Sequence, residues 1–256
     1  MDPKVAVVGL VVGLLVGLTG MGGGAIMTPA LILLGWAKPM VAVGTDLMWG
    51  TLTKSVGAFV HQRQGTVDFS IVKRLALGSV PGALAGLALL AHLHMRRGGA
   101  TDRIIVKTLG VALMCVALSL FARSLWGSWI RARVQLHVTG DRQWLTSAVG
   151  AVVGFLVSLT SVGSGSLIVA CLVLIYPATP LKRIVGSDIF HALLLVGVSA
   201  LGHLGLGSIN VSLLTSLLLG SIPGVCLGSK LSTVFPEKVL SPVMASTLMV
   251  LGYKLL

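Results

Sequence analysis

The stretch Leu18-Thr19-Gly20-Met21-Gly22-Gly23-Gly24-Ala25 interrupts the first hydrophobic segment of the chain with a cluster of glycines. The stretch Leu159-Thr160-Ser161-Val162-Gly163-Ser164-Gly165-Ser166 interrupts an equivalent segment in the second half. The two breaks belong to a duplication, because residues 12–90 return in register, although diverged, as residues 153–232. Glycine-interrupted hydrophobic segments at corresponding positions of two membrane repeats are typical of secondary transporters and point to the binding site.

Three later landmarks support the register of the duplication, because they recur at one constant offset. The matched pairs are Gly44-Thr45-Asp46 with Gly186-Ser187-Asp188, His61-x-x-x-Gly65-Thr66-x-Asp68 with His203-x-x-x-Gly207-Ser208-x-Asn210, and Gly78-Ser79-Val80-Pro81-Gly82 with Gly220-Ser221-Ile222-Pro223-Gly224. We therefore predict that the two copies have one fold.

Composition predicts an all-α integral membrane protein. The chain is 55% hydrophobic and only 10% charged, whereas soluble domains carry about 25% charged residues. Its apolar stretches lack the alternation of barrel strands, and they are long enough to cross a bilayer as helices. The net charge of +12 comes from short basic clusters between apolar segments. That pattern is typical of membrane-protein loops, so we expect a lipid bilayer as a partner and no nucleic acid.

Ten hydrophobic segments can be drawn, five in each copy. They lie at about 5–20, 25–37, 40–61, 70–94 and 103–123, and at about 143–160, 165–177, 183–204, 211–231 and 239–255. We predict a first transmembrane repeat at 1–123, a basic connector at 124–142 and a second repeat at 143–256. The second segment of each copy would reach only about 20 Å as a helix. Either the first pair of each copy forms a re-entrant hairpin or it contains tilted, broken helices.

Loop charges bear on the topology. Lys54 lies inside a predicted span, and the other basic residues divide 11 to 7 between the two sides if each copy makes an odd number of crossings or a hairpin plus three. Four crossings per copy would divide them 9 to 9. The positive-inside bias favours the odd count, which makes the two copies inverted repeats and places both termini outside the cytoplasm.

The breaks are the strongest candidates for a substrate site. Glycine exposes backbone N–H groups, and a helix that begins after such a break directs its first N–H groups and its positive dipole end into the gap. An oxyanion suits that environment, although a bent helix without a ligand is the alternative. The candidate substrate-binding residues are Thr19, Gly22, Gly23, Gly24, Ala25, Thr160, Gly163, Ser164, Gly165 and Ser166.

Four ionisable residues are candidates for proton or charge coupling. Asp46 and Asp188 occupy equivalent positions, and His191 follows Asp188 by three residues, so both can share one helix face. Each Asp could instead cap a helix at the membrane boundary. Lys54 lies deep in a predicted span, where it could attract an anion, pair with Asp46 or extend toward the cytoplasmic end.

Two prolines, Pro81 and Pro223, lie inside predicted helices at equivalent positions and are candidate hinges. Tight helix packing through the neighbouring glycines is the alternative explanation. No histidine or cysteine cluster has the spacing of metal ligands, and no nucleophile or nucleotide motif occurs. We therefore expect no metal, no cofactor, no catalytic residue and no enzyme activity.

The motifs together resemble the TauE/SafE family of sulfite exporter-type permeases. They are Gly22-Gly23-Gly24-Ala25-x-x-x-Pro29, Val43-Gly44-Thr45-Asp46, Thr53-Lys54-x-x-Gly57-Ala58, His61-Gln62-Arg63-Gln64-Gly65-x-Val67-Asp68, Leu77-Gly78-Ser79-x-Pro81-Gly82 and Val185-Gly186-Ser187-Asp188-Ile189-x-His191-Ala192. The resemblance covers nearly the whole chain apart from the connector. It implies a multi-pass secondary transporter of the bacterial inner membrane that moves sulfur-containing oxyanions or organosulfonates.

We therefore expect a permease that moves a small anion such as sulfite or a sulfonate by alternating access, coupled to protons or to the membrane potential. A passive anion channel built on the same broken helices is the alternative. The expected partners are the small anionic substrate and the bilayer, and a homodimer is left open. Ser164 stands where the first copy has a central glycine, so the two halves are chemically unequal.

Overall fold

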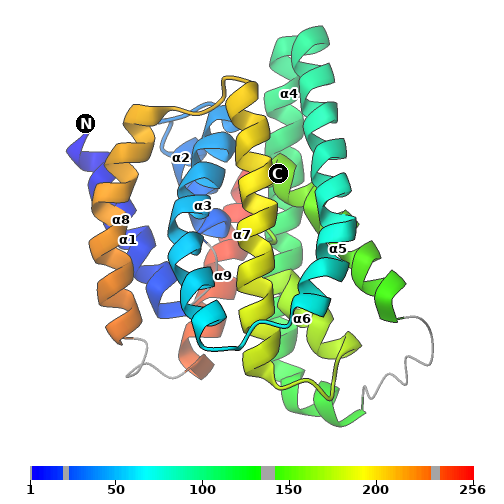
Figure 1. Ribbon diagram of the computed structural model, residues 1–256. Coiled ribbons are helices and arrows are strands. Elements are labelled where there is room, and N and C mark those ends of the chain that lie inside the picture. The colour runs from blue at the N-terminus through cyan, green and yellow to red at the C-terminus, as the bar shows by residue number, and fades with distance from the viewer. Residues whose placement is uncertain (1, 20–22, 134–141, 232–236) are drawn as a thin grey trace.

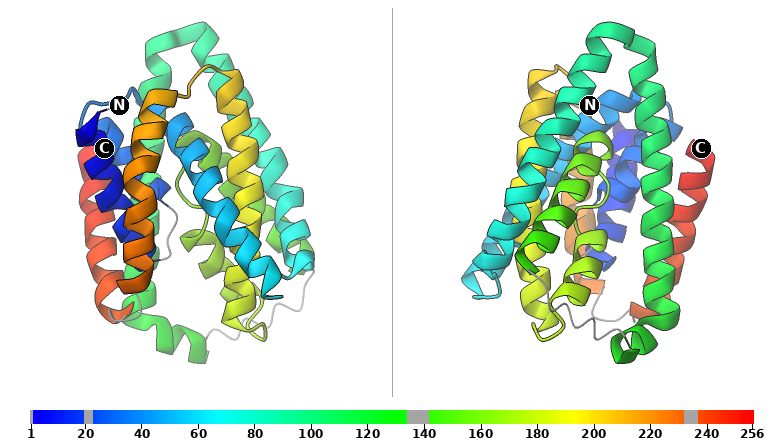
Figure 2. Two further views of the ribbon diagram at one scale, coloured as in Figure 1. Left: turned by 60° about the vertical axis from the view of Figure 1, so that its left-hand side comes forward. Right: turned by 90° about the vertical axis from the view of Figure 1, so that its right-hand side faces the viewer.

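The computed structural model describes residues 2–19, 23–133, 142–231 and 237–256, and these ranges contain helices but no strands (Figure 1). The helices are α1 (Pro3–Thr19), α2 (Gly24–Leu33), α3 (Pro39–Arg63), α4 (Phe69–Arg133), α5 (Arg142–Thr160), α6 (Ser166–Ile175), α7 (Leu181–Gly205), α8 (Val211–Leu231) and α9 (Glu237–Leu255). Within α4 the chain turns back on itself between two spans, Phe69–Met95 and Thr101–Phe121 (Figure 2). Each of the ten predicted segments is therefore present as a helix or as one limb of α4.

Length and surface chemistry confirm an all-α membrane fold. Among the residues that the structure describes, five helical stretches are long and apolar enough to cross a bilayer, namely Phe69–Met95, Thr101–Phe121, Gln143–Thr160, Leu181–Gly205 and Val211–Leu231. Large apolar side chains lie on the outside of the bundle, where Val56, Leu77 and Leu201 are each more than 60% exposed. Such side chains are unfavourable in water but match the hydrocarbon of a bilayer.

The first pair of helices in each copy forms a hairpin. In Figure 1, α1 descends, α2 returns upward and α3 descends again, whereas α5 rises, α6 descends and α7 rises. Contacts agree with these directions, because the start of α2 at Gly23 meets Trp49 of α3 while Thr28, further along α2, meets the earlier residue Asp46. Of the two arrangements that the sequence left open, the structure has the hairpin.

The two halves pack on one another through reciprocal helix pairs. Helix α1 lies along α8, and its counterpart α5 lies along α4, the counterpart of α8. A β-carbon at Gly82, next to Pro81, would collide with the backbone of Ala151, and one at Gly224, next to Pro223, would collide with the backbone of Leu10. Glycine is needed in these helices because the backbones approach too closely for a side chain. Tight packing therefore explains the glycine spacing beside the two prolines.

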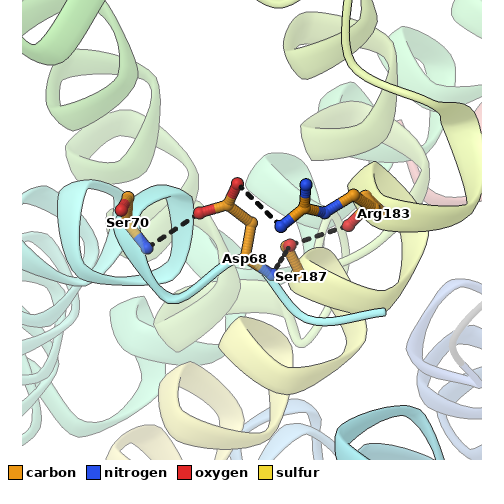
Figure 3. A network of polar contacts seen from close by, with 4 residues as sticks. All are labelled: Asp68, Ser70, Arg183 and Ser187. Atoms are coloured by element: carbon orange, nitrogen blue, oxygen red, sulfur yellow. Dashed lines mark hydrogen bonds and ion pairs between the residues drawn. The ribbon is translucent and has the colours of Figure 1, made fainter. Parts of the chain in front are cut away.

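Reciprocal hydrogen bonds join α3 and α7 to the loops of the opposite half. The backbone N–H of Asp68 donates to Ser187 Oγ at 2.7 Å (Figure 3), and the N–H of the equivalent residue Asn210 donates to Thr45 Oγ1 at 3.1 Å. The first site has an additional ion pair between Asp68 and Arg183, with 3.8 Å between the charged atoms. Two sites with matching backbone contacts thus differ in their side-chain charge.

Corresponding helices of the two halves run in opposite directions, as α3 and α7 show in Figure 1. Both termini lie toward the same end of the bundle, together with the turn inside α4 (Figure 2). The inverted orientation of the copies relative to a bilayer stays a prediction. The predicted division into two repeats and a basic connector at 124–142 stays a prediction, and α4 continues as helix to Arg133. Residues 134–141 of that connector lie outside the described ranges.

The buried apolar residues form two clusters. One combines α1, α2, α8 and α9 with the second limb of α4, and the other combines α3, α5, α6 and α7 with the first limb of α4. Met48 of α3 packs against both clusters, and the neighbouring Trp49 belongs to the first.

Candidate functional site

The two glycine breaks meet inside the bundle. A β-carbon at Gly24, the first residue of α2, would collide with the carbonyl oxygen of Ser161 in the second break. The chain therefore brings together two segments that are far apart in sequence but equivalent in the duplication. This contact places the start of α2 beside the link between α5 and α6.

Glycine serves a different purpose in each break. Gly163 and Gly165 have φ angles of +113° and +125°, which L side chains rarely adopt, and Ser161 is also left-handed at +61°. Gly23 has an ordinary helical φ of −59°, but a β-carbon there would collide with the indole ring of Trp49. The second break thus depends on glycine for its backbone conformation, and the first depends on it for space.

A small cavity lies between the breaks. Its lining residues are Val16, Thr19, Ala25, Ile26, Val116, Ser161, Gly163, Ser164, Met244 and Leu248. Its free volume is about 10 Å³, which is close to the minimum for a single water molecule. The cavity is too small for a sulfur oxyanion of four or more heavy atoms, so the structure is closed at this point.

Four of the predicted substrate-binding residues, Thr19, Ala25, Gly163 and Ser164, line the cavity. Gly23, Gly24, Thr160 and Gly165 belong to the same two breaks but do not line it, and Ser166 is the first residue of α6. Gly22 lies outside the described residues. The Thr19 and Thr160 hydroxyls donate to carbonyl oxygens one turn earlier, at Leu15 and Leu156.

The alternative role of Asp46 and Asp188 as helix caps is wrong. The helices that carry them begin seven residues earlier, at Pro39 and Leu181, so both acids lie well inside a helix. Proline explains the difference: Pro39 is the first residue of α3, and Pro180 precedes α7, where its fixed φ suits a helix start. Both side chains are buried, with 1% and 3% exposure.

The buried carboxyl groups have different surroundings. Thr28 Oγ1 donates to Asp46 Oδ2 at 2.6 Å, whereas Oδ1 of Asp46 and Oδ1 of Asp188 have no hydrogen-bond partner. An unpaired buried oxygen is costly and marks a site that a ligand, a proton or water can complete. The two acids are thus equivalent in sequence but unequal in structure.

Lys54 links the charges to the second break. Its Nζ donates to Ser164 Oγ at 2.9 Å and lies 3.4 Å from the Ser164 carbonyl oxygen. The ammonium also interacts electrostatically with both Asp46 and Asp188. Of the three alternatives for Lys54, the contact with the break favours a place at the predicted anion site over extension toward the helix end.

Trp49 and His191 occupy equivalent positions and make equivalent contacts. Trp49 Nε1 donates to Ser221 Oγ at 2.7 Å, and His191 Nε2 lies 2.7 Å from Ser79 Oγ. His191 is fully buried, and its Nδ1 has no partner. The second half therefore has an ionisable ring where the first half has an indole that fills the space beside Gly23.

Several residues of the site were not predicted from the sequence, namely Thr28, Trp49, Ser79, Ser161 and Ser221. Ser79 and Ser221 belong to a repeated motif, and their helix partners are the exchanged pair Trp49 and His191, so the duplication carried a usable signal. The sequence contains no such signal for Thr28, because its hydrogen bond to Asp46 depends on how α2 folds back on α3. Pro81 and Pro223 lie inside continuous helices, and their hinge role stays a prediction.

In the described part of the chain, no three His, Cys, Asp or Glu side chains are placed to bind a metal ion. The site consists of backbone groups, hydroxyls, two carboxyls, one ammonium and one imidazole. Helices of spanning length around two broken segments and a buried charge cluster define a membrane protein with the architecture of a transporter.

The chain belongs to the sulfite exporter TauE/SafE family, because the sequence model of that family matches residues 5–255. It is 42% identical over 257 residues to the probable membrane transporter protein YjnA of Bacillus subtilis, with 100% of both chains covered. It is 24% identical to the probable membrane transporter protein YunE of the same organism, covering 98% of this chain and 95% of YunE. A probable membrane transporter protein of Xylella fastidiosa is 26% identical, with 88% and 82% covered. No solved structure matches the chain. The protein is therefore a multi-pass membrane transporter.

Proposed function

We propose that this protein is a secondary transporter that moves a small sulfur-containing oxyanion, such as sulfite or a sulfonate, across the bacterial inner membrane by alternating access. The substrate site lies between the two glycine breaks. The observation that carries the proposal is the hydrogen bond from Lys54 to Ser164, because it places a cation of α3 at the break that leads into α6.

Backbone geometry supports an anion at this place. Ile26 is the first residue of α2 whose N–H bonds inside the turn, to the Gly23 carbonyl oxygen, so the N–H of Ala25 has no intrahelical acceptor. Ala25 lines the cavity, and α6 begins three residues after Gly163 on the opposite side. Two helix N-termini and one ammonium form the kind of environment that binds oxyanions.

The division of the core supports the proposal of alternating access. The cavity is lined by Val116, Met244 and Leu248 of one side and by the second break on the other. Because it is closed, a substrate can enter only if the two apolar clusters move apart on one side of the membrane at a time. Pro81 and Pro223, in the helices that carry the reciprocal packing, are the proposed hinges.

Purified protein in proteoliposomes tests the proposal. We expect saturable uptake of radiolabelled sulfite or ethanesulfonate that is accelerated when the same anion is preloaded. Lys54→Gln should abolish uptake, because the amide removes the positive charge but keeps a hydrogen-bond donor near Ser164. Lys73→Gln is the matched control, because Lys73 lies exposed on α4, and it should transport normally.

Counterflow separates the carrier from the channel. A carrier exchanges internal for external anion without net movement, whereas a channel gives a conductance that no preloading stimulates. Wild-type uptake by Lys54→Gln would contradict the proposed site. A lack of uptake of sulfite, thiosulfate, sulfate, sulfoacetate and ethanesulfonate by the wild-type protein would contradict the proposed substrate class.

A further inference from the structure

We propose that each anion crosses together with a proton bound to Asp188. Lys54 couples the two, because its ammonium group balances the Asp188 carboxylate when the site is empty and the anion when the site is filled. This inference rests on the proposed function and deepens it by assigning the coupling ion and the residue that binds it. The geometry behind it is the hydrogen bond from Lys54 to the second break, together with two buried carboxyls that each have an unpartnered oxygen and on which the charge of Lys54 acts.

Within the described ranges, the site contains two buried carboxyl groups but a single ammonium group to balance them. Lys54 is the cation that interacts with the buried acids Asp46 and Asp188, and one oxygen of each acid has no hydrogen-bond partner. A net charge in a medium of low dielectric constant is strongly unfavourable unless it is paired. When an anion enters and takes Lys54 as its counter-charge, the acids lose their shared partner. A proton on one of them restores the balance.

Asp188 is the acid that binds this proton. Asp46 accepts a 2.6 Å hydrogen bond from Thr28, and such a bond favours the ionised form of a carboxyl group. The residue equivalent to Thr28 in the second copy is Val169, which offers no donor. Asp188 therefore depends on Lys54 for stabilisation of its charge, and it is the first to take a proton when Lys54 turns to an anion.

The neighbours of Asp188 are consistent with this assignment. Helix α7 packs against α3, α4, α5 and α6. From α3 the charge of Lys54 acts on Asp188, and Asp46 shares that cation. On α4 the neutral hydroxyl of Ser79 contacts His191, and in the α5–α6 link the neutral hydroxyl of Ser164 accepts from Lys54. On α7 itself, the buried His191 lies one turn from Asp188, and its Nδ1 has no hydrogen-bond partner.

The step is balanced in atoms and charge. An O–H bond forms on the free Oδ1 of Asp188 with a proton from water on the side to which the site is open, and Lys54 leaves Ser164 for the incoming anion. After the site opens to the other side, the anion leaves, Lys54 returns, and the O–H bond breaks as the proton passes to water. A monovalent anion then moves with one proton and no net charge.

Ethanesulfonate is the decisive probe, because its sulfonate keeps a single charge across the assayed pH range and so carries no proton itself. In proteoliposomes with a trapped pH-sensitive dye, ethanesulfonate influx should be accompanied by acidification of the lumen, and an inward proton gradient should drive accumulation. In Asp188→Asn the proton movement should fall to background while counterflow of ethanesulfonate persists, since an amide keeps the shape but cannot exchange a proton.

Matched variants separate coupling from folding. Asp188→Glu keeps the carboxyl group and should retain proton movement, although at a lower rate. Asp68→Asn is the control, because this acid lies in the α3–α4 loop outside the cluster and its amide oxygen can still accept the N–H of Ser70, so proton movement should be retained. Asp46→Asn tests the other buried acid. Monodisperse elution of each variant and its counterflow activity show that it is folded.

The outcomes are distinguishable. Ethanesulfonate or sulfite flux without proton movement in the wild-type protein would overturn the coupling and leave the proposed function standing. Gradient-driven accumulation by Asp188→Asn would also overturn it, and loss of proton movement only in Asp46→Asn would assign the proton to the other acid. If neither anion is transported by the wild-type protein, the proposed function itself fails and the inference fails with it.

Discussion

Replacement of Gly23 by alanine tests whether space beside Trp49, and not backbone freedom, is what the first break requires. The φ of Gly23 is −59°, a value that alanine adopts without strain. Gly23 is the N-cap of α2, so alanine gains there at most a part of its advantage inside helices, which is about 1 kcal/mol. If backbone freedom were the only role of this glycine, the substitution would be neutral or stabilising.

The structure predicts the opposite sign. The new β-carbon would overlap carbon atoms of the Trp49 ring, which is 1% exposed and has no open side into which to move. Overpacking of a buried site costs about 1–3 kcal/mol, and displacement of the ring also threatens the 2.7 Å bond from Nε1 to Ser221. That hydrogen bond contributes about 0.5–1.5 kcal/mol. After the gain in helix propensity, we expect a net loss of about 1–3 kcal/mol.

The assay is thermal unfolding of the detergent-purified protein at one fixed scan rate, since membrane-protein unfolding is commonly irreversible. A loss of 1 kcal/mol lowers Tm by about 2–4 °C in a chain of this size. Trp49→His places the ring of the second copy in the first and removes the obstacle. The added effect of Gly23→Ala in that background should therefore shrink, giving a coupling of about 0.5–3 kcal/mol.

Gly205→Ala in α7 is the control, because a β-carbon there meets no atom within 4 Å, and it should leave Tm unchanged or raise it. An unchanged Tm for Gly23→Ala would refute the steric argument. So would a drop in Tm of equal size with and without Trp49→His.

Three further predictions concern the second break, the surface ion pair and the topology. Gly165→Ala should lower stability by about 1–3 kcal/mol through backbone strain, because its φ is +125°, and it should impair uptake; a wild-type Tm would contradict the left-handed conformation. Arg183→Gln should change Tm by less than about 4 °C, because the exposed pair with Asp68 contributes at most about 1 kcal/mol; a larger fall would show that the pair holds the loop against α7. Cysteines added at both termini should react with a membrane-impermeant maleimide from the periplasmic side of intact cells, and labelling of either terminus only after permeabilisation would contradict the inverted topology.

The arrangement of the helices was largely predictable from the sequence, because hydrophobic length and the duplication both depend on local pattern. The predicted span at 40–61 became Pro39–Arg63, and that at 211–231 became Val211–Leu231. The hairpin of α1 and α2 could not be chosen over a broken, tilted helix. The arrangement depends on the surface against which α2 packs. That surface includes Ser161, which contacts Gly24 although it lies more than a hundred residues away in the sequence.

The site was predictable in its location but not in its internal contacts. The breaks, both acids and Lys54 follow from the rarity of glycine runs and charges in a membrane span. The bond from Lys54 to Ser164 does not follow, because it joins residues on helices whose relative rotation is set by the packing of α3 on α7. The cap interpretation of Asp46 failed for a local reason. The sequence Thr45-Asp46 resembles a helix start, but Pro39 begins the helix two turns earlier.

The exchange of Trp49 for His191 shows how a duplicated scaffold can carry an asymmetric site. Both residues bond an equivalent serine at 2.7 Å, so the backbone geometry of the two halves is maintained. The indole, however, fills the space beside Gly23, whereas the side of His191 contains Asp188 and the break reached by Lys54. Both halves still contribute to the proposed site, because Lys54 of the first half reaches the break of the second. The exchange therefore leaves an indole on one side of that site and an ionisable ring on the other, although the packing of the two halves is equivalent.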